Sequence, residues 1–399
     1  MPTHARVCVL PKDFGPLDVI DIDLPDPGPH QVIVKQFASG VCHSQLHQMH
    51  NPRQSHVVLG HESTGVVAKA GSDVTDLDEG DTVLVTWVPK NAAGSTRAPA
   101  PAVLDLPGGE TAMSQNVFTW ADHTIADEQY VVKVAGDIDK EVTAIIGCAV
   151  MTGAGAVENT AGVKAGESVA IFGVGGVGLS AVVAAKALGA SPIIAVDLDD
   201  DKLAFAQQFG ATHTINAAKT DPVEGIRALT VHDDKRSMRG QPTVGADYVF
   251  DCIGIKKTME QIVPAARQGF FGAEPGGTAV LVGVPQTTVE LNAIDILVNE
   301  KKFIGSIGGS CSPARDFPKY LDWSADGRLD LDVMVTARYS IDDINEATRA
   351  LATAGEISGR AILAFDSRVH NSGAAGVRSR LDEQATQQDD EREIPDGRR

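Results

Sequence analysis

The feature that most constrains this chain is a glycine-rich turn between a short apolar run and an alanine-rich segment. Residues 168–172 (SVAIF) predict a buried strand, the turn occupies 173–178 (GVGGVG), and a helix is predicted over 177–189. In such a G-x-G-x-x-G turn the first glycine permits a tight bend. The second lets the backbone approach a pyrophosphate, and the third lets the helix pack closely on the strand. The unpaired N–H groups at the start of the helix favour an anion, so the pattern predicts a dinucleotide site.

A second apolar run, 192–196, ends in Asp197, nineteen residues after Gly178. A carboxylate at this position can accept both ribose hydroxyls of NAD and would repel the 2′-phosphate of NADP. Further strands are predicted at 247–251 and 278–284. Strands that alternate with helices indicate a doubly wound parallel sheet, so we expect an α/β protein with an NAD-binding Rossmann domain.

The first 145 residues have a different sequence pattern, in which short apolar runs are separated by turns rich in Pro, Gly and Asp. This pattern predicts a β-rich domain. Its predicted strands include 32–34, 64–67, 82–85 and 130–132. The segment 88–116, rich in Pro, Ala, Gly and Ser, is predicted to be a long surface lobe or loop, and 231–242 is predicted to be a charged loop.

Residues 340–364 predict a helix followed by a last apolar strand, 361–364, whereas 366–399 carry no aromatic residue and few aliphatic ones. The latter composition is typical of a disordered tail. The expected domains are 1–151 together with 311–365, the Rossmann domain 152–310, and the tail 366–399.

Charge and hydropathy exclude several classes of partner. The chain has 34 Lys and Arg against 53 Asp and Glu, a formal net charge of −19. Nucleic acids and anionic membranes bind clustered cations, so neither is expected as a partner. No apolar stretch approaches the roughly 18–20 residues of a membrane span, and no signal-peptide core follows the first residues. We therefore expect a cytoplasmic protein that acts on a small molecule.

The five cysteines are odd in number and form no CxxC pair, which argues against a disulfide framework. Any functional cysteine is therefore expected to be a metal ligand or a nucleophile. Cys42 and His61 are separated by eighteen residues and supply two of the three protein ligands that a catalytic zinc requires. The third ligand must come from elsewhere in the chain.

The segment Gly60-His61-Glu62-x-x-Gly65-x5-Gly71-x-x-Val74 resembles the signature of the zinc-dependent alcohol dehydrogenases, within the medium-chain dehydrogenase/reductase superfamily. The similarity covers about residues 5–365, in the order GroES-like β-rich domain, Rossmann domain, return to the first domain. It implies that Cys148 is the third zinc ligand. It also implies reversible oxidation of an alcohol to an aldehyde or ketone with hydride transfer to NAD, and a homodimer or homotetramer.

The resemblance assigns roles to further residues. Ser44 would accept the proton of the substrate alcohol, and His47 would pass it to solvent. Glu62 would lie just behind the metal, and Trp87 would line the substrate pocket. The residues that it implies in cofactor binding are His43, Thr152, Gly173, Gly175, Gly176, Val177, Gly178, Asp197, Lys202, Val282, Val284 and Arg360.

The chain departs from this family in two respects. Many relatives bind a second, structural zinc through four closely spaced cysteines, but residues 86–125 contain no cysteine, so one zinc per chain is expected. Relatives also commonly place an Asp where this chain has Gln45, behind the metal-bound histidine. The amide oxygen of Gln45 could accept a hydrogen bond from that imidazole but carries no charge.

Two alternatives differ from this reading. A thiol-adduct dehydrogenase of the formaldehyde type would need cations at the pocket mouth, where Arg53 and several histidines of 43–60 occur. A non-catalytic dinucleotide-binding protein would be expected to have lost Cys42, Ser44 or His61, and all three are present.

Overall fold

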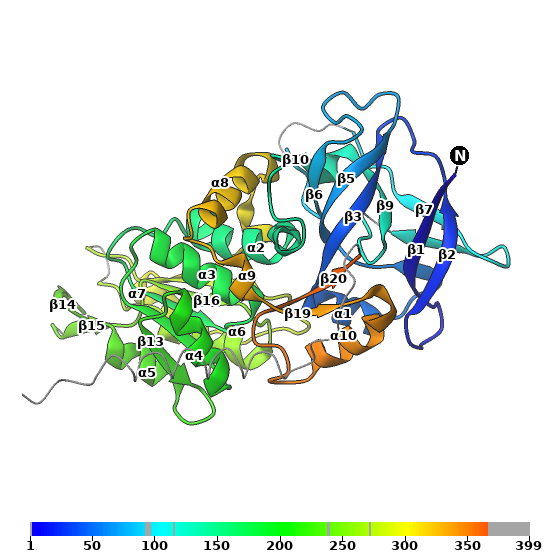
Figure 1. The fold of residues 1–399 in the computed structure, drawn as a ribbon. Helices are drawn as coiled ribbons and strands as arrows, with labels where there is room; N and C mark the ends of the chain where they lie inside the picture. Colours follow the sequence, from blue (N-terminus) through cyan, green and yellow to red (C-terminus); the bar gives the residue numbers. More distant parts are fainter. Residues whose placement is uncertain (1, 92–96, 115, 238–239, 271–272, 366–399) are drawn as a thin grey trace, which may run out of the picture. The chain divides into compact units, whose positions relative to one another are not determined.

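The computed structural model describes residues 2–91, 97–114, 116–237, 240–270 and 273–365 (Figure 1). The predicted tail, 366–399, lies outside the described residues. Within the described ranges, no helix has both the length and the apolar character needed to cross a membrane.

A six-stranded parallel sheet in the described chain carries the glycine-rich turn, in the order β13-β12-β11-β16-β17-β18. Its strands are β11 (Val169–Phe172), β12 (Ile193–Asp197), β13 (His213–Asn216), β16 (Tyr248–Asp251), β17 (Thr278–Leu281) and β18 (Lys302–Gly305). The helices between and beside them are α3 (Gly176–Ala187), α4 (Asp200–Phe209), α5 (Pro222–Leu229), α6 (Lys256–Ala265) and α7 (Ala293–Asn299).

Both faces of this sheet are buried, as the continuous apolar run of β11 requires. Val169 and Ile171 belong to one hydrophobic core, whereas Ala170 and Phe172 belong to another. Successive side chains of a strand point to opposite faces, so one short strand contributes to two cores. The predicted doubly wound parallel sheet is confirmed.

The β-rich first part of the chain forms two further sheets within the described residues. One has the order β10-β6-β5-β3-β20-β19 with β9 also on β3, and comprises β3 (Gln31–Val41), β5 (Glu62–Ala70), β6 (Thr82–Thr86), β9 (His123–Asp127), β10 (Val131–Lys133), β19 (Val335–Tyr339) and β20 (Arg360–Ala364). The other has the order β2-β1-β4-β8-β7, with β1 (Thr3–Leu10), β2 (Asp18–Leu24), β4 (His56–Val58), β7 (Ala102–Asp105) and β8 (Thr111–Ser114).

The C-terminal strand β20 returns to the N-terminal sheet, where it pairs antiparallel with β3 and Ala361 lies opposite Val41 (Figure 1, orange-red beside blue). Arg360 and Cys42, the next residues at this end of the pairing, thereby become neighbours. The other α-helices are α1 (His43–His50), α2 (Ala149–Gly155), α8 (Pro313–Ala325), α9 (Leu331–Met334) and α10 (Ile344–Ala352). Short turns of 3-10 helix are η1 (Glu128–Tyr130), η2 (Val142–Gly147), η4 (Gly308–Ser310) and η5 (Ile341–Asp343), and η3 (Ala156–Ala161) is a π-helical turn.

Of the two alternatives for 88–116, a loop is wrong for part of the segment and a lobe fits it better, because this part contains the antiparallel hairpin β7–β8. Leu104 and Ala112 of this hairpin are fully buried and pack in one core with strands of the same sheet. β8 also pairs with β4. The apolar residues here are few, but they alternate with exposed ones, as in a half-buried strand.

The predicted charged loop over 231–242 is also wrong. Residues 231–236 form β14 (Val231–Arg236), which pairs antiparallel with β15 (Pro242–Val244). His232 is half-buried, and its Nε2 lies 3.0 Å from the carbonyl oxygen of Gly245. The charged side chains are compatible with a strand because this ribbon presents most of them to solvent.

Candidate functional site

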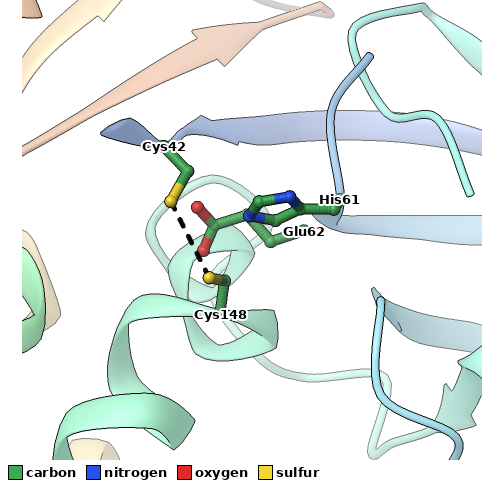
Figure 2. A group of neighbouring side chains, drawn as sticks. All are labelled: Cys42, His61, Glu62 and Cys148. Atoms are coloured by element: carbon green, nitrogen blue, oxygen red, sulfur yellow. Dashed lines mark hydrogen bonds between the residues drawn. The ribbon is translucent and has the colours of Figure 1, made fainter. Parts of the chain in front are cut away.

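Three ends of secondary structure bring the candidate ligands together (Figure 2). Cys42 follows β3 and caps the N-terminus of α1, while His61 directly precedes β5, which pairs with β3. Cys148 lies between η2 and α2. The ligand atoms of Cys42, His61, Cys148 and the neighbouring Glu62 all lie within 4.8 Å of one another, and the two Sγ atoms are 3.9 Å apart.

The chemistry of this cluster fits a zinc ion. Two thiols and an imidazole are among the ligands that zinc prefers, and three protein ligands leave one position open. The Nε2 atom of His61 is buried and has no hydrogen-bond partner. A buried polar atom without a partner is costly, and a metal ion between it and the thiols would satisfy it.

The two thiols of the cluster do not share the same protonation. A hydrogen bond from the Cys148 thiol, together with the positive charge of Arg360, lowers the pKa of Cys42 well below its ordinary value despite burial. The Cys42 thiolate and burial in turn raise the pKa of Cys148. The site therefore stabilises one thiolate by itself, and a cation would be needed to hold the second.

Glu62 forms a buried ion pair with Arg360 beside the cluster. Its carboxylate is fully buried, accepts a hydrogen bond from the Arg360 guanidinium, and lies 3.3 Å from the backbone N–H of Ala149. Burial raises the pKa of Glu62, and the charge of Arg360 opposes that rise. The sequence analysis missed this pair, because its members are 298 residues apart and only the β3–β20 pairing brings them together.

Gln45 lies behind His61, as expected, but with the opposite atom toward it. The Gln45 Oε1 accepts a hydrogen bond from the backbone N–H of Gly60, and its Nε2 lies 3.0 Å from His61 Nδ1. The expectation that the amide oxygen accepts from the imidazole is therefore wrong. A backbone N–H competes for that oxygen, and the sequence carries no signal of this.

Two further predicted catalytic residues, Ser44 and His47, lie on α1, and the predicted pocket residue Trp87 follows β6. The half-buried Ser44 donates a hydrogen bond to Cys42 Sγ at 3.2 Å, which places its hydroxyl beside the cluster. His47 is half-buried one turn further along α1, with its ring centroid 5.7 Å from that of His43. Trp87, one residue beyond β6, has its ring centroid 6.3 Å from that of His61.

The glycine-rich turn has the predicted geometry. Gly173 adopts φ +83°, which favours glycine, and a Cβ on Gly178 would lie 1.9 Å from the carbonyl oxygen of Gly173. A Cβ on Gly175 would meet nothing within 4 Å, so this backbone is open to a ligand. Asp197 ends β12 beside the turn, and its carboxylate accepts from the backbone N–H of Val174 at 3.0 Å.

The remaining candidate cofactor residues fall into two groups. His43, Lys202 and Arg360 are close enough to interact electrostatically. Burial, then the neighbouring His47, and then the charges of Arg360 and Lys202 lower the pKa of His43. Arg360 also lies beside Gly176 at the start of α3, where a Cβ would meet its Cδ at 3.0 Å.

The second group comprises Thr152, Val282 and Val284. Thr152 on α2 is buried and its hydroxyl has no hydrogen-bond partner. Val282 and Val284 follow β17, which is shorter than the predicted strand 278–284; Val282 is half-buried and Val284 is exposed. The first group supplies an imidazole and two cations, and the second supplies a hydroxyl and two apolar side chains.

Comparisons with known proteins find relatives that span both the β-rich part and the nucleotide-binding part of the chain. Residues 28–136 match the alcohol dehydrogenase GroES-like domain family, and residues 176–326 match the zinc-binding dehydrogenase family. The S-(hydroxymethyl)glutathione dehydrogenase of Paracoccus denitrificans is 31% identical over 371 residues, which cover 86% of this chain and 95% of the relative.

Solved structures extend the similarity to the fold. An alcohol dehydrogenase zinc-binding domain protein from Burkholderia ambifaria aligns with a TM-score of 0.79 at 28% identity, covering 92% of this chain and 100% of that chain. The benzyl alcohol dehydrogenase of Acinetobacter calcoaceticus aligns with a TM-score of 0.77 at 27% identity, covering 91% of this chain and 99% of that chain.

Proposed function

Because this chain belongs to the zinc-dependent alcohol dehydrogenase family, we propose that it oxidises an alcohol to an aldehyde or ketone, reversibly, at a zinc site formed by Cys42, His61 and Cys148. The observation that carries the ligand assignment is the buried and unpartnered Nε2 of His61 within reach of two thiols. Zinc, when bound, supplies a Lewis acid that lowers the pKa of an alcohol, and the nicotinamide accepts the hydride.

The protein residues balance the charge of the site. Cys42, Cys148 and His61 would hold a divalent cation with two thiolates and a neutral imidazole, and this ligand set would cancel the charge of the cation. The opposite charges of the buried pair Glu62 and Arg360 cancel, so this pair adds no net charge behind the centre.

Ser44 and His47 move the proton of the alcohol. The Ser44 hydroxyl lies against the Cys42 sulfur, so it would be placed to turn from the thiolate toward the hydroxyl of a substrate beside the cluster. His47 lies further along α1 with partial exposure and would exchange the proton with solvent.

NAD is the proposed cofactor, held at the turn 173–178. The Asp197 carboxylate is fixed at the end of β12 by the backbone N–H groups of Val174 and Leu198, at 3.0 Å and 2.7 Å. A fixed carboxylate can accept the ribose hydroxyls and would repel a 2′-phosphate. Arg360 and Lys202 would face the pyrophosphate and the adenosine ribose.

We further propose the domain limits expected from the sequence, with 1–151 and 311–365 as the catalytic domain and 152–310 as the NAD-binding domain. A cytoplasmic homodimer or homotetramer with one zinc per chain is part of the same proposal.

The thiol-adduct alternative is weakened by the contacts of Arg53. Its guanidinium donates to the carbonyl oxygens of Pro11 and Met49 and lies 5.1 Å from the ring centroid of Phe14. An arginine engaged in this way is poorly placed to bind the carboxylates of a thiol adduct. A simple alcohol therefore remains the proposed substrate, although the relative from Paracoccus denitrificans is named for a thiol adduct.

Elemental analysis and turnover with NAD would test the proposal on the full chain. We expect one zinc per chain and NADH formation with at least one member of a panel of aliphatic, benzylic and terpenoid alcohols. Cys8→Ala removes a buried thiol outside the cluster and serves as the control, with metal content and turnover retained. A wild-type protein that takes up no zinc would contradict the proposal.

A further inference from the structure

The side chain of Gln45 contacts three polar groups behind the proposed zinc site. It is 2% exposed. Its Oε1 accepts from the backbone N–H of Gly60, its Nε2 donates to Gln48 Oε1 at 3.0 Å, and the same Nε2 lies 3.0 Å from His61 Nδ1.

The backbone N–H of Gly60 determines which way this amide points. A backbone N–H can only donate, so the atom that faces it must be the oxygen of Gln45. The NH2 group then necessarily faces His61. An NH2 group can only donate, so His61 Nδ1 must be the acceptor.

This arrangement determines the tautomer of His61. A neutral imidazole whose Nδ1 accepts a hydrogen bond carries its proton on Nε2. Nε2, however, is the nitrogen that remains free for the metal, because Nδ1 is already occupied by Gln45. A metal ligand must offer a lone pair at that atom, with the proton on the other nitrogen.

We infer that Gln45 is a positioning residue that holds metal-free His61 in the tautomer opposed to zinc binding, so that zinc binds more weakly than it would to the same ligands backed by a carboxylate. The inference rests on the proposed function, since it requires His61 to be a ligand. Zinc binding then requires the Gln45 amide to turn over or withdraw, and either movement leaves the Gly60 N–H without its acceptor.

A carboxylate at position 45 removes this conflict. Gln45→Glu has nearly the same shape, and its two oxygens can accept from the Gly60 N–H and from a protonated His61 Nδ1 together. The exposed amide of Gln48 can rotate to donate to the new carboxylate. Partners behind a metal ligand typically change metal affinity by about 10–100-fold, so we expect Gln45→Glu to raise zinc affinity about tenfold.

Competition with a chromophoric chelator, on the full chain loaded with zinc alone, would measure this affinity. Gln48→Glu is the matched control, since it adds the same charge on the same helix but next to the Gln45 NH2 group rather than next to His61. We expect it to leave zinc affinity unchanged or to lower it, because a carboxylate there strengthens the present orientation of Gln45. Equal gains in Gln45→Glu and Gln48→Glu would mean that only the added charge acts, and would overturn the inference.

Nitrogen NMR of the metal-free wild type gives a readout that does not depend on the folding of a variant. The signals of His61 are identified by their loss in His61→Gln, and we expect a protonated Nε2 and an unprotonated Nδ1. The reverse tautomer would overturn the inference. A wild type that binds one zinc, with no gain in Gln45→Glu, refutes this inference alone. A wild type that binds no zinc refutes the proposed function.

Discussion

Removing the charge partner of Glu62 is expected to destabilise the protein severely. In Arg360→Met, the methionine retains much of the apolar stem of arginine but not the guanidinium. The Glu62 carboxylate is fully buried, and the Arg360 side chain is 6% exposed. Breaking such a pair costs about 3–5 kcal/mol, because a buried charge is left without its partner. After the substitution the backbone N–H of Ala149, at 3.3 Å, still faces the carboxylate.

A double-mutant cycle separates the ion pair from general packing loss. Glu62→Gln alone removes the carboxylate partner of the guanidinium, which then keeps the Cys42 sulfur as an acidic neighbour. Glu62→Gln combined with Arg360→Met leaves two neutral side chains and therefore no unpaired charge from this pair. The sum of the stability losses of the two single variants should therefore exceed the loss of the double variant by roughly 2–3 kcal/mol.

Equilibrium urea unfolding of chelator-treated protein is the appropriate assay, because loss of a metal ion then contributes nothing to the differences. Arg349→Met is the matched control. Arg349 pairs with Glu346 and Glu356 at the surface, with its side chain 52% exposed, and we expect an unfolding midpoint close to that of the wild type. An Arg360→Met variant within about 1 kcal/mol of wild type, or a double variant whose loss equals the sum of the single losses, would refute the reasoning.

Four further predictions concern single positions. Cys148→Ala should remove the zinc measured by elemental analysis and abolish turnover while NADH binding, followed by fluorescence, persists; retained turnover would exclude Cys148 as a ligand. Asp197→Ala should narrow the preference for NAD over NADP in kcat/KM, and a wild type that already uses both equally would contradict its assigned role. His47→Gln should slow alcohol oxidation most below about pH 7, where solvent is a poor proton acceptor. Ser44→Ala should be slower still and should not recover at high pH. Rates of both variants from about pH 6 to 10 would decide, and a His47→Gln enzyme with an unchanged pH–rate profile would remove His47 from the relay. Burial alone would raise the pKa of Asp247, but hydrogen bonds from Ser168 and the ion pair with Arg267 outweigh it and lower the pKa, so its ionised form stabilises the folded state. Asp247→Asn should therefore cost about 1.5–3 kcal/mol near neutral pH, and the difference from wild type in urea unfolding should shrink below pH 3.8 as the wild-type carboxyl protonates; a difference that does not change with pH would contradict this.

The dinucleotide half of the molecule could be predicted from sequence because its signal is local. Gly173 needs a positive φ, and a side chain on Gly178 would collide with the Gly173 carbonyl oxygen, so the turn admits few other residues. The hairpin β7–β8 could not be predicted in this way. Its pairing depends on β4, more than forty residues earlier, and its burial depends on that neighbour more than on its own composition.

The difference between local and long-range signals also explains which parts of the site could be predicted from the sequence. His61 stands in a glycine-rich motif that resembles a family signature, but nothing local identified the buried pair of Glu62 and Arg360. That contact exists because β20 pairs with β3, and strand pairing at such separation has no local sequence signal. The orientation of the Gln45 amide could not be predicted from the sequence either. The group that determines it is the backbone N–H of Gly60, and every residue but proline has such a group. The expectation from residue type was that an amide oxygen would replace a carboxylate oxygen behind His61. The hydrogen-bond competition at Gly60 reverses the amide, so the departure from the family pattern changes the tautomer of the ligand as well as the charge behind it.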